Sequence, residues 1–334
     1  MMNNLNTFKD REVRWGIIGA GDVCEVKSAP AMQKIPSSSL VAVMRRNAEK
    51  AEDYAKRHRV PKWYDDAGQL ISDPDVNAIY IATPPDSHMH YTLKAAAAGK
   101  PVYVEKPMAR TWQECQKMIE ACDGAGVQLY VAYYRRTLPH FLKIKSLIEN
   151  GAIGDVRTVH IRMCKSPLTG ANADPDNNWR VDPEKAGGGL FYDLASHQLD
   201  FLDFLFGKIG QAGGFSANQA GLYPAEDLVT GCFEFENGVL GTGNWCFTSA
   251  DLYEADQTLI TGSKGQISYE TFGKGEFLLE TDNEGEKTFR FDLPEHIQYN
   301  LIQSIVEELL GNGRCPSTGA SAARTNWVME QIVY

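Results

Sequence analysis

Short apolar runs alternate with helix-like segments along the first third of the chain. The runs that predict buried strands are residues 13–18, 40–44, 78–82, 102–105 and 128–132. The segments with helical periodicity are residues 29–35, 47–60, 88–98 and 111–125. Strands that alternate with helices in this way predict βαβ units and a parallel sheet.

The pattern changes at about residue 156, where the strands become longer and polar residues alternate with apolar ones. The segments with this alternation are residues 156–164, 230–247, 257–270 and 276–293. Glu236-Asn237-Gly238 and residues 282–285 are typical hairpin turns. We therefore expect a mainly antiparallel sheet with one face covered and the other available for association, and a helix at residues 296–310 that closes the fold.

The length of 334 residues is typical of about two domains. The change of pattern places them at residues 1–135 and 136–334.

Composition excludes several kinds of partner. The chain has 33 Lys and Arg against 43 Asp and Glu, a net charge of −10, which is unlike a nucleic-acid binder. No apolar run reaches the roughly 18 residues that cross a membrane, and the first residues do not resemble a signal peptide. The seven cysteines show no CxxC spacing, so we expect reduced thiols in a cytoplasmic protein and no metal site.

A glycine turn follows the first predicted strand. Gly19 permits a tight turn, and Gly21 lets the backbone approach a pyrophosphate where Asp22 and Val23 begin a helix. Cys24 occupies the position of a third glycine, where a small residue is tolerable. Glycines also serve ordinary strand-to-helix turns, but this position in a βαβ pattern favours dinucleotide binding.

Two arginines follow the second predicted strand. A site that prefers NAD places a carboxylate about 20 residues after the glycine turn, but Arg45 and Arg46 stand in this region. Guanidinium groups suit a 2′-phosphate, so we expect NADP(H) to be favoured, with NAD(H) possible. The alternative is a solvated basic surface.

Four motifs, read in order, resemble the Gfo/Idh/MocA oxidoreductase family. They are GIIGAGDV at residues 16–23, IATPPDSHMHY at 81–91, AGKPVYVEKPM at 98–108 and GGGLFYDLASHQLD at 187–200. The resemblance covers nearly the whole chain. It implies an α/β fold: an N-terminal Rossmann domain with a doubly wound parallel sheet, and a C-terminal α+β domain that binds substrate and forms oligomers.

The resemblance also implies roles for individual residues. Lys106 matches the family's catalytic lysine, and Asp193 and His197 match a pair on the first helix of the second domain. Thr83, Pro84, His88 and Glu105 match cofactor-bordering positions, together with Lys106. Tyr134, Arg135, Arg136, Trp179 and Arg180 match positions that often contact substrate.

Physical chemistry agrees with the implied catalytic roles. Asp193 and His197 are four residues apart, so they share one face of a helix. A histidine can accept a hydroxyl proton near neutral pH, and a cation such as Lys106 stabilises the developing negative charge. Which of the two accepts the proton stays open.

Structural alternatives exist for most of these residues. Asp193 could cap a helix, and His88 or His197 could be ordinary core or helix-start residues. Arg135 and Arg136 could form a salt-bridged surface.

The expected function is oxidation of a secondary alcohol on a sugar, polyol or cyclic diol, or the reverse reduction, with NAD(P)(H). The alternatives are an NAD-dependent glycosidase that acts by transient oxidation and a non-catalytic dinucleotide sensor. We expect a homodimer or homotetramer formed through the C-terminal sheet, with no nucleic-acid or membrane partner.

Overall fold

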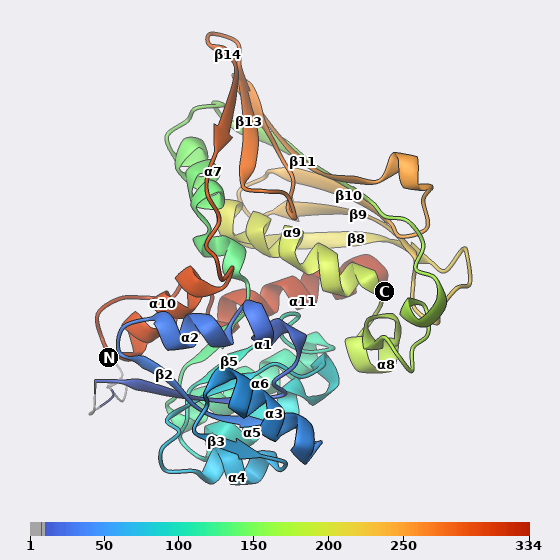
Figure 1. Cartoon of the computed structure of the whole chain (residues 1–334). Helices are drawn as coiled ribbons and strands as arrows, with labels where there is room; N and C mark the ends of the chain where they lie inside the picture. The colour runs from blue at the N-terminus through green and yellow to red at the C-terminus, as the bar shows by residue number, and fades with distance from the viewer. Residues whose placement is uncertain (1–7, 9–10) are drawn as a thin grey trace. The chain divides into compact units, whose positions relative to one another are not determined.

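The computed structural model describes residue 8 and residues 11–334, and their contacts divide the chain into two compact units, each described here by itself (Figure 1). The first unit ends at Tyr134 but also includes Pro294–Ala323. The second unit comprises Arg135–Leu293 and Arg324–Tyr334. The expected division into residues 1–135 and 136–334 therefore differs from the structure in two respects: Arg135 belongs to the second unit, and residues 294–323 return to the first.

The first unit is built on a parallel six-stranded sheet with the order β3-β2-β1-β4-β5-β6. This is the Rossmann strand order: β2 and β3 are added on one side of β1, whereas β4, β5 and β6 are added on the other. The strands are β1 (Val13–Ile18), β2 (Ser38–Met44), β3 (Lys62–Tyr64), β4 (Ala78–Ile81), β5 (Val102–Val104) and β6 (Leu129–Val131).

Successive residues of a strand point to opposite faces of the sheet, and both faces of this sheet are buried. Trp15, Tyr80 and Tyr103 belong to one apolar cluster, whereas Ile79 and Val104 belong to the other. The helices of this unit are α1 (Asp22–Val26), α2 (Ala29–Lys34), α3 (Ala48–His58), α4 (Ala67–Ser72), α5 (His88–Ala97), α6 (Trp112–Ala125) and α10 (Tyr299–Leu309), with a 3₁₀ turn η1 (Pro85–Ser87).

Helix α10 explains why residues 294–323 return to the first unit. It lies beside α2, although about 260 residues separate them in the sequence (Figure 1). Leu301, Ile302 and Ile305 on its inner face are fully buried in the same apolar cluster as Trp15. Without α10 this face of the sheet would lose part of its core.

The second unit contains an eight-stranded sheet with the order β14-β13-β12-β11-β7-β10-β9-β8. Its neighbouring strands pair antiparallel except for β7 and β10, which are parallel. The strands are β7 (Val156–Cys164), β8 (Ile209–Ala217), β9 (Leu228–Phe235), β10 (Leu240–Cys246), β11 (Ala255–Gly262), β12 (Gly265–Tyr269), β13 (Glu276–Thr281) and β14 (Gly285–Arg290).

Helix α9 covers the inner face of this sheet, and most of its residues are buried. The helices of the unit are α7 (Pro139–Glu149), α8 (Pro183–Ala186) and α9 (Leu190–Phe206), with the 3₁₀ turns η2 (Tyr134–Thr137), η3 (Gly170–Asn172), η4 (Trp179–Val181) and η5 (Asp251–Tyr253). Helix α11 (Gly319–Val333) begins in the first unit and ends in the second.

The predicted α/β class, parallel first sheet and mainly antiparallel second sheet are confirmed. The sequence pattern missed β3, α4, α7, β8 and α11. β3 has only three residues, and β8 reads as a loop because three of its nine residues are glycine. Glycine is depleted in ordinary strands, so this composition hides β8.

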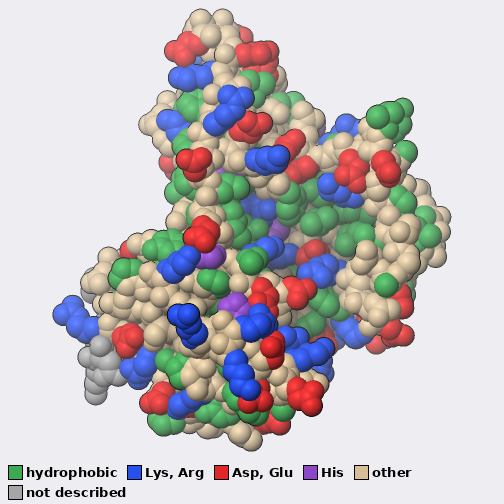
Figure 2. Space-filling model, in the orientation of Figure 1, with side chains coloured by type: hydrophobic (Ala, Val, Ile, Leu, Met, Phe, Trp, Pro, Cys, Tyr) green, Lys and Arg blue, Asp and Glu red, His purple; other side chains and the backbone are tan. Residues whose placement is uncertain are grey.

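Acidic and basic side chains are interspersed over the face drawn in Figure 2. The net charge of −10 is therefore not gathered into one broad acidic field on this face. Within residue 8 and residues 11–334, no helix is both long and apolar enough to cross a membrane.

Candidate functional site

The glycine turn after β1 has the backbone geometry that a pyrophosphate requires. Gly19 has φ +86°, and its N–H donates to the carbonyl of Met44 at 3.0 Å. A Cβ on Gly19 would lie 2.6 Å from Cγ2 of Thr83, so a larger residue would collide with the loop after β4. A Cβ on Gly21 would meet only the Gly19 carbonyl oxygen, at 3.8 Å, so the space before Gly21 is open. These residues fit a bound dinucleotide.

Helix α1 begins directly at this turn, with Gly21 as its N-cap. Asp22 is exposed and Val23 is half-buried, whereas Cys24 points into the core and is fully buried. Burial raises the pKa of the Cys24 thiol to about 12. Cys24 therefore serves as a small packing residue, as the third glycine of such turns does.

Arg45 and Arg46 follow β2 as predicted. The Arg45 N–H donates to the carbonyl of Tyr64 on β3, which fixes the backbone at this strand end. Arg45 is half-buried and Arg46 exposed. Among the described residues neither side chain forms an ion pair.

His88 joins two loops of the first unit. It is fully buried, its Nε2 lies 2.7 Å from the Thr83 carbonyl oxygen, and its Nδ1 lies 3.1 Å from that of Met108. Burial lowers the pKa of the imidazole. Because both ring nitrogens face main-chain carbonyls, this geometry favours a role in holding the loops rather than the direct cofactor contact expected from the sequence. Thr83 and Pro84 are half-buried.

Glu105 and Lys106 follow β5. The Glu105 side chain is buried, accepts the Tyr80 hydroxyl at 2.6 Å and accepts the backbone N–H of Lys106 at 3.2 Å. Lys106 is half-buried, and the Lys106–Pro107 peptide bond is cis. Glu105 is thus engaged by this chain's own donors, and Lys106 has the more accessible side chain of the two.

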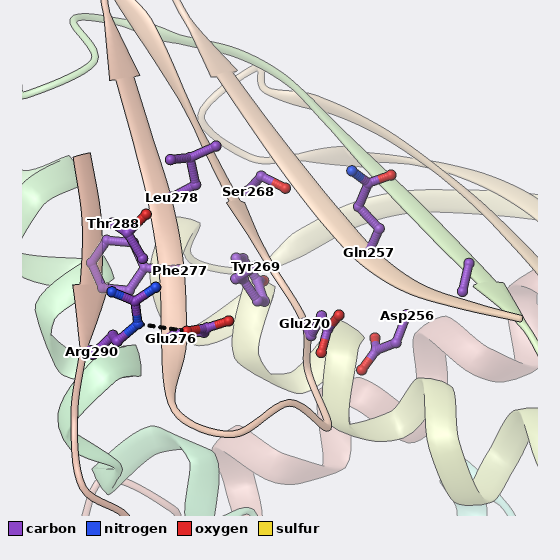
Figure 3. Close-up of a pocket in the computed structure, with 11 residues that line it drawn as sticks. Asp256, Gln257, Ser268, Tyr269, Glu270, Glu276, Phe277, Leu278, Thr288 and Arg290 are labelled. Atoms are coloured by element: carbon purple, nitrogen blue, oxygen red, sulfur yellow. Dashed lines mark hydrogen bonds and ion pairs between the residues drawn. The ribbon is translucent and has the colours of Figure 1, made fainter. Parts of the chain in front are cut away.

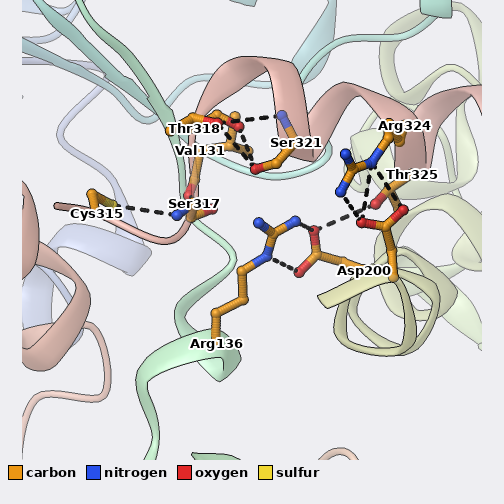
Figure 4. A network of polar contacts seen from close by, with 10 residues as sticks. Val131, Arg136, Asp200, Cys315, Ser317, Thr318, Ser321, Arg324 and Thr325 are labelled. Carbon is orange, nitrogen blue, oxygen red and sulfur yellow. Dashed lines mark hydrogen bonds and ion pairs between the residues drawn. The ribbon is translucent and has the colours of Figure 1, made fainter. Parts of the chain in front are cut away.

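Arg136 lies inside the second unit. It is 1% exposed, and its guanidinium forms two bonds to the Asp200 carboxylate, at 2.9 and 2.6 Å (Figure 4). Thr325 and the Arg324–Asp203 pair extend this network onto α11. Burial raises the pKa of Asp200 to about 6, although Arg136 opposes this effect. The arrangement favours a structural role for Arg136 over the substrate contact expected from the sequence.

The second unit brings Trp179, Arg180 and Asp193 together. Nε of Arg180 lies 3.2 Å from the Asp193 carboxylate, and the guanidinium lies over the Trp179 ring at 4.5 Å. The N-cap of α9 is Gly189, whose N–H donates to Glu226 at 2.7 Å, so Asp193 is not the cap of this helix.

His197 lies one turn further along α9 and is 3% exposed. Its ring meets the ring of Phe272 edge to face, with centroids 5.7 Å apart. The Arg135 guanidinium lies over the same ring at 4.4 Å, and its Nε donates to the Thr271 carbonyl at 2.8 Å. Arg135 and His197 thus share one aromatic neighbour, which is 40% exposed.

Sequence reasoning missed Phe272 and the residues that hold it. The backbone N–H of Phe272 donates to Asp256 at 2.6 Å, and the Asp256 carboxylate also accepts from Gln198 at 3.4 Å. Trp245 donates to the Gln198 side chain at 2.7 Å. The sequence gives no periodic or motif signal for this loop, although Gln198 stands directly after His197.

A separate pocket of about 430 Å³ lies on β11–β14 of the second unit (Figure 3). Arg290 and Glu276 form an ion pair at its edge. None of the residues expected to bind or catalyse lines it. In the described part of the chain no group of three or more His, Cys, Asp or Glu is placed to hold a metal ion.

Family models match both halves of the chain. A model described as an oxidoreductase family with an NAD-binding Rossmann fold matches residues 13–133. A GFO/IDH/MocA C-terminal domain model matches residues 141–268.

Curated relatives align over most of the chain. Oxidoreductase P35 of Formosa agariphila is 38% identical over 323 residues, which cover 96% of this chain and 98% of that protein. A 1,5-anhydro-D-fructose reductase of Ensifer adhaerens is 30% identical, covering 92% and 91%. A trans-1,2-dihydrobenzene-1,2-diol dehydrogenase of Bos taurus is 32% identical, covering 76% and 72%.

Solved structures share the fold. A levoglucosan dehydrogenase in complex with NADH and levoglucosan superposes with a TM-score of 0.85 at 23% identity, covering 96% of each chain. An aldose-aldose oxidoreductase from Caulobacter crescentus gives a TM-score of 0.84 at 23% identity and the same coverage.

Proposed function

The chain belongs to the Gfo/Idh/MocA family of NAD-binding Rossmann-fold oxidoreductases, and on this premise we propose that it transfers a hydride between NADP(H) and a sugar, polyol or cyclic diol. The reacting group is a secondary alcohol in one direction and its ketone in the other. Two relatives that carry the names of an anhydro-sugar reductase and a cyclic-diol dehydrogenase support this substrate class.

The preference for NADP(H) rests on the end of β2. Arg45 and Arg46 form no ion pair with the described residues, and residues 43–47 contain no carboxylate. Gly19, Gly21, Asp22 and Val23 would border the pyrophosphate, and Thr83 and Pro84 would border the nicotinamide end. A 2′-phosphate would supply an anionic partner for these two guanidinium groups.

When bound, the cofactor supplies the nicotinamide ring that accepts or donates the hydride. His197 would take the substrate hydroxyl proton at a ring nitrogen, and the ammonium of Lys106 would stabilise the negative charge that develops on the substrate oxygen. Asp193 would accept a hydrogen bond from substrate and orient it, with its carboxylate held by Arg180.

Substrate contacts are proposed for Tyr134, Arg135, Trp179 and Arg180. The contact between Arg180 and Asp193 supports a shared role for these two residues. The contact of Arg135 with Phe272, the aromatic neighbour of His197, supports a place for Arg135 near the reacting groups.

Two rival functions predict different products. An NAD-dependent glycosidase would release sugar with no net change in cofactor, and a dinucleotide sensor would bind cofactor without turnover. The proposed dehydrogenase would consume one NADPH for each carbonyl reduced. Incubating sugars, polyols and cyclic diols with NADP⁺, and following the absorbance of the NADPH formed together with the products, separates the three.

Replacement of Lys106 tests the proposed chemistry directly. Lys106→Ala should lower kcat at least about 100-fold, because it removes a charge that acts on the reacting oxygen. Lys106→Arg, which keeps a cation, should retain more activity than Lys106→Ala. Steady-state NADPH kinetics measure both variants, and a Lys106→Ala enzyme within tenfold of the wild type would refute the role.

A further inference from the structure

A buried polar network is hydrogen-bonded to the backbone of Lys106, and one of its members comes from residues 294–323. Gln298, the N-cap of α10, is 1% exposed. Tyr80 on β4 and Tyr103 on β5 are fully buried, and their rings stack with centroids 4.7 Å apart. Glu105 completes the group, and all four residues belong to the first unit.

Three hydrogen bonds join the four residues to one another, and a fourth reaches the backbone of Lys106. Oε1 of Glu105 accepts from the Tyr80 hydroxyl at 2.6 Å and from Nε2 of Gln298 at 2.7 Å. Oε2 of Glu105 accepts the N–H of Lys106 at 3.2 Å. The Tyr103 hydroxyl donates to Oε1 of Gln298 at 2.8 Å.

The donors and acceptors of these side chains complement one another. A carboxyl group has two oxygens that can each accept more than one hydrogen bond, and Glu105 accepts from three donors at once. The amide of Gln298 has one accepting and one donating end, and Tyr103 occupies the accepting end. The donating end is therefore directed at Glu105. A buried donor or acceptor that loses its partner is costly, so the group is held in one arrangement.

We propose that Gln298 is a positioning residue that acts through Glu105 to hold the backbone of Lys106 in place for catalysis. The inference rests on the proposed function, in which the Lys106 ammonium acts on the substrate oxygen. It also links the docking of α10 to the catalytic turn, because Leu301 and Ile302 anchor the same helix in the core. The segment after residue 293 thereby contributes to the chemistry as well as to the fold.

The test compares Gln298→Met with Gln303→Met in the full-length protein. Methionine keeps the length of the side chain but forms neither amide bond. Gln303 lies on the same helix and bonds to Glu307 in an exposed position, so it is the matched control. A third variant, Leu301→Ala, weakens the same helix in its apolar core without touching Glu105.

Gln298→Met should lower kcat about 10- to 100-fold, since small misplacements of a catalytic group have effects of this size. The Kd for NADPH, from fluorescence titration, should change less than about threefold. Gln303→Met should match the wild type, and Leu301→Ala should lower the melting temperature without a comparable fall in kcat.

Hydrogen exchange gives a second readout that needs neither cofactor nor turnover. In the protein without cofactor, the peptide that contains the Lys106 amide should exchange at least about tenfold faster in Gln298→Met than in Gln303→Met. If Gln298→Met does not fold, Tyr80→Phe removes the other donor to the same carboxylate oxygen and should change both readouts in the same direction.

Unchanged exchange, unchanged kcat, or a fall in kcat no greater than that of Leu301→Ala would each overturn the role of Gln298. A wild-type protein without NADPH turnover on any substrate would instead overturn the proposed function, and the role of Gln298 with it. An active wild type with an unaffected Gln298→Met variant overturns the role of Gln298 alone.

Discussion

Arg45 and Arg46 stand at the end of β2 without an ion-pair partner among the described residues. Exposed arginines are common, but these two follow β2, which lies beside β1 in the sheet, and the glycine turn follows β1. A charge-assisted hydrogen bond contributes about 1.5–3 kcal/mol. At about 1.4 kcal/mol for each factor of ten, one such bond to a 2′-phosphate is enough to set the cofactor preference.

Arg46→Ala should therefore lower the preference for NADP⁺ over NAD⁺ by roughly 10- to 100-fold. The measurement is the ratio of the two dissociation constants from fluorescence titration. Lys94→Ala, which removes an exposed cation on α5, should leave the ratio unchanged. An unaltered ratio in Arg46→Ala would show that the arginine belongs to a solvated surface.

Single residues also show where sequence reasoning stops. The residue types of His88 and Arg136 marked them as candidates for binding, but their partners decide what they do. His88 meets the carbonyls of Thr83 and Met108, and Arg136 meets Asp200 in the interior. No residue near Arg136 in the sequence predicts its contact with Asp200, which is 64 positions away.

Helices α1 and α3 are joined by a charged contact that responds to pH. Glu25 on α1 accepts two hydrogen bonds from Arg57 at 2.9 Å and contacts His58 at 2.6 Å. The Arg57 bonds, with help from His58, lower the pKa of Glu25 from 4.5 to about 2. Because the folded state holds the ionised form, this contribution to stability is complete above about pH 5 and is lost as pH falls toward 2.

Glu25→Gln should lower the melting temperature at pH 7 by about 1 to 4 °C, a contribution of about 0.5–1 kcal/mol for a pair exposed to solvent. The difference from the wild type should narrow as pH is lowered from 5 to 3. Glu52→Gln, which removes an exposed partner of Lys56 on α3, is the control and should have a smaller effect. Thermal scans over this pH range would contradict the assignment if the difference stayed constant.

At the scale of elements, the predicted strands and helices of the first unit were largely confirmed. The structure adds that Asn47 caps α3 and Thr111 caps α6. Of the elements that were missed, β3 is short and β8 is rich in glycine. Their stability comes from neighbours that pair with them, since β8 is held along its length by β9. A strand of this kind has no local signal strong enough to predict it.

The outer face of the eight-stranded sheet carries exposed apolar side chains. Phe215 on β8 is 85% exposed and Leu240 on β10 is 55% exposed. Their neighbours on this face include exposed Thr230 and Asn244, so the face is broad and mixed in polarity. Antiparallel sheets can leave one face open, and such a face suits a second copy of the chain.

We expect the chain to form a homodimer or homotetramer through this face. Combining Phe215→Glu with Leu240→Glu should shift the protein to monomers, because it places two charges on the face that the interface would bury. Leu252→Glu is the control, since Leu252 is also 85% exposed but lies in η5 outside the sheet. Sedimentation velocity measures all three proteins, and an unchanged mass for the double variant would exclude this interface.

By itself, the sequence determined the α/β class, the glycine turn after β1, the two arginines after β2 and the change from parallel to antiparallel strands. These features are local, because periodicity, glycine placement and turn chemistry act within a few residues. Only the tertiary structure decided that residues 294–323 return to the first unit and that Phe272 meets His197. It also decided that Gln298 reaches Glu105 across 193 positions. Such contacts depend on how whole elements pack, and no short window of sequence contains both partners.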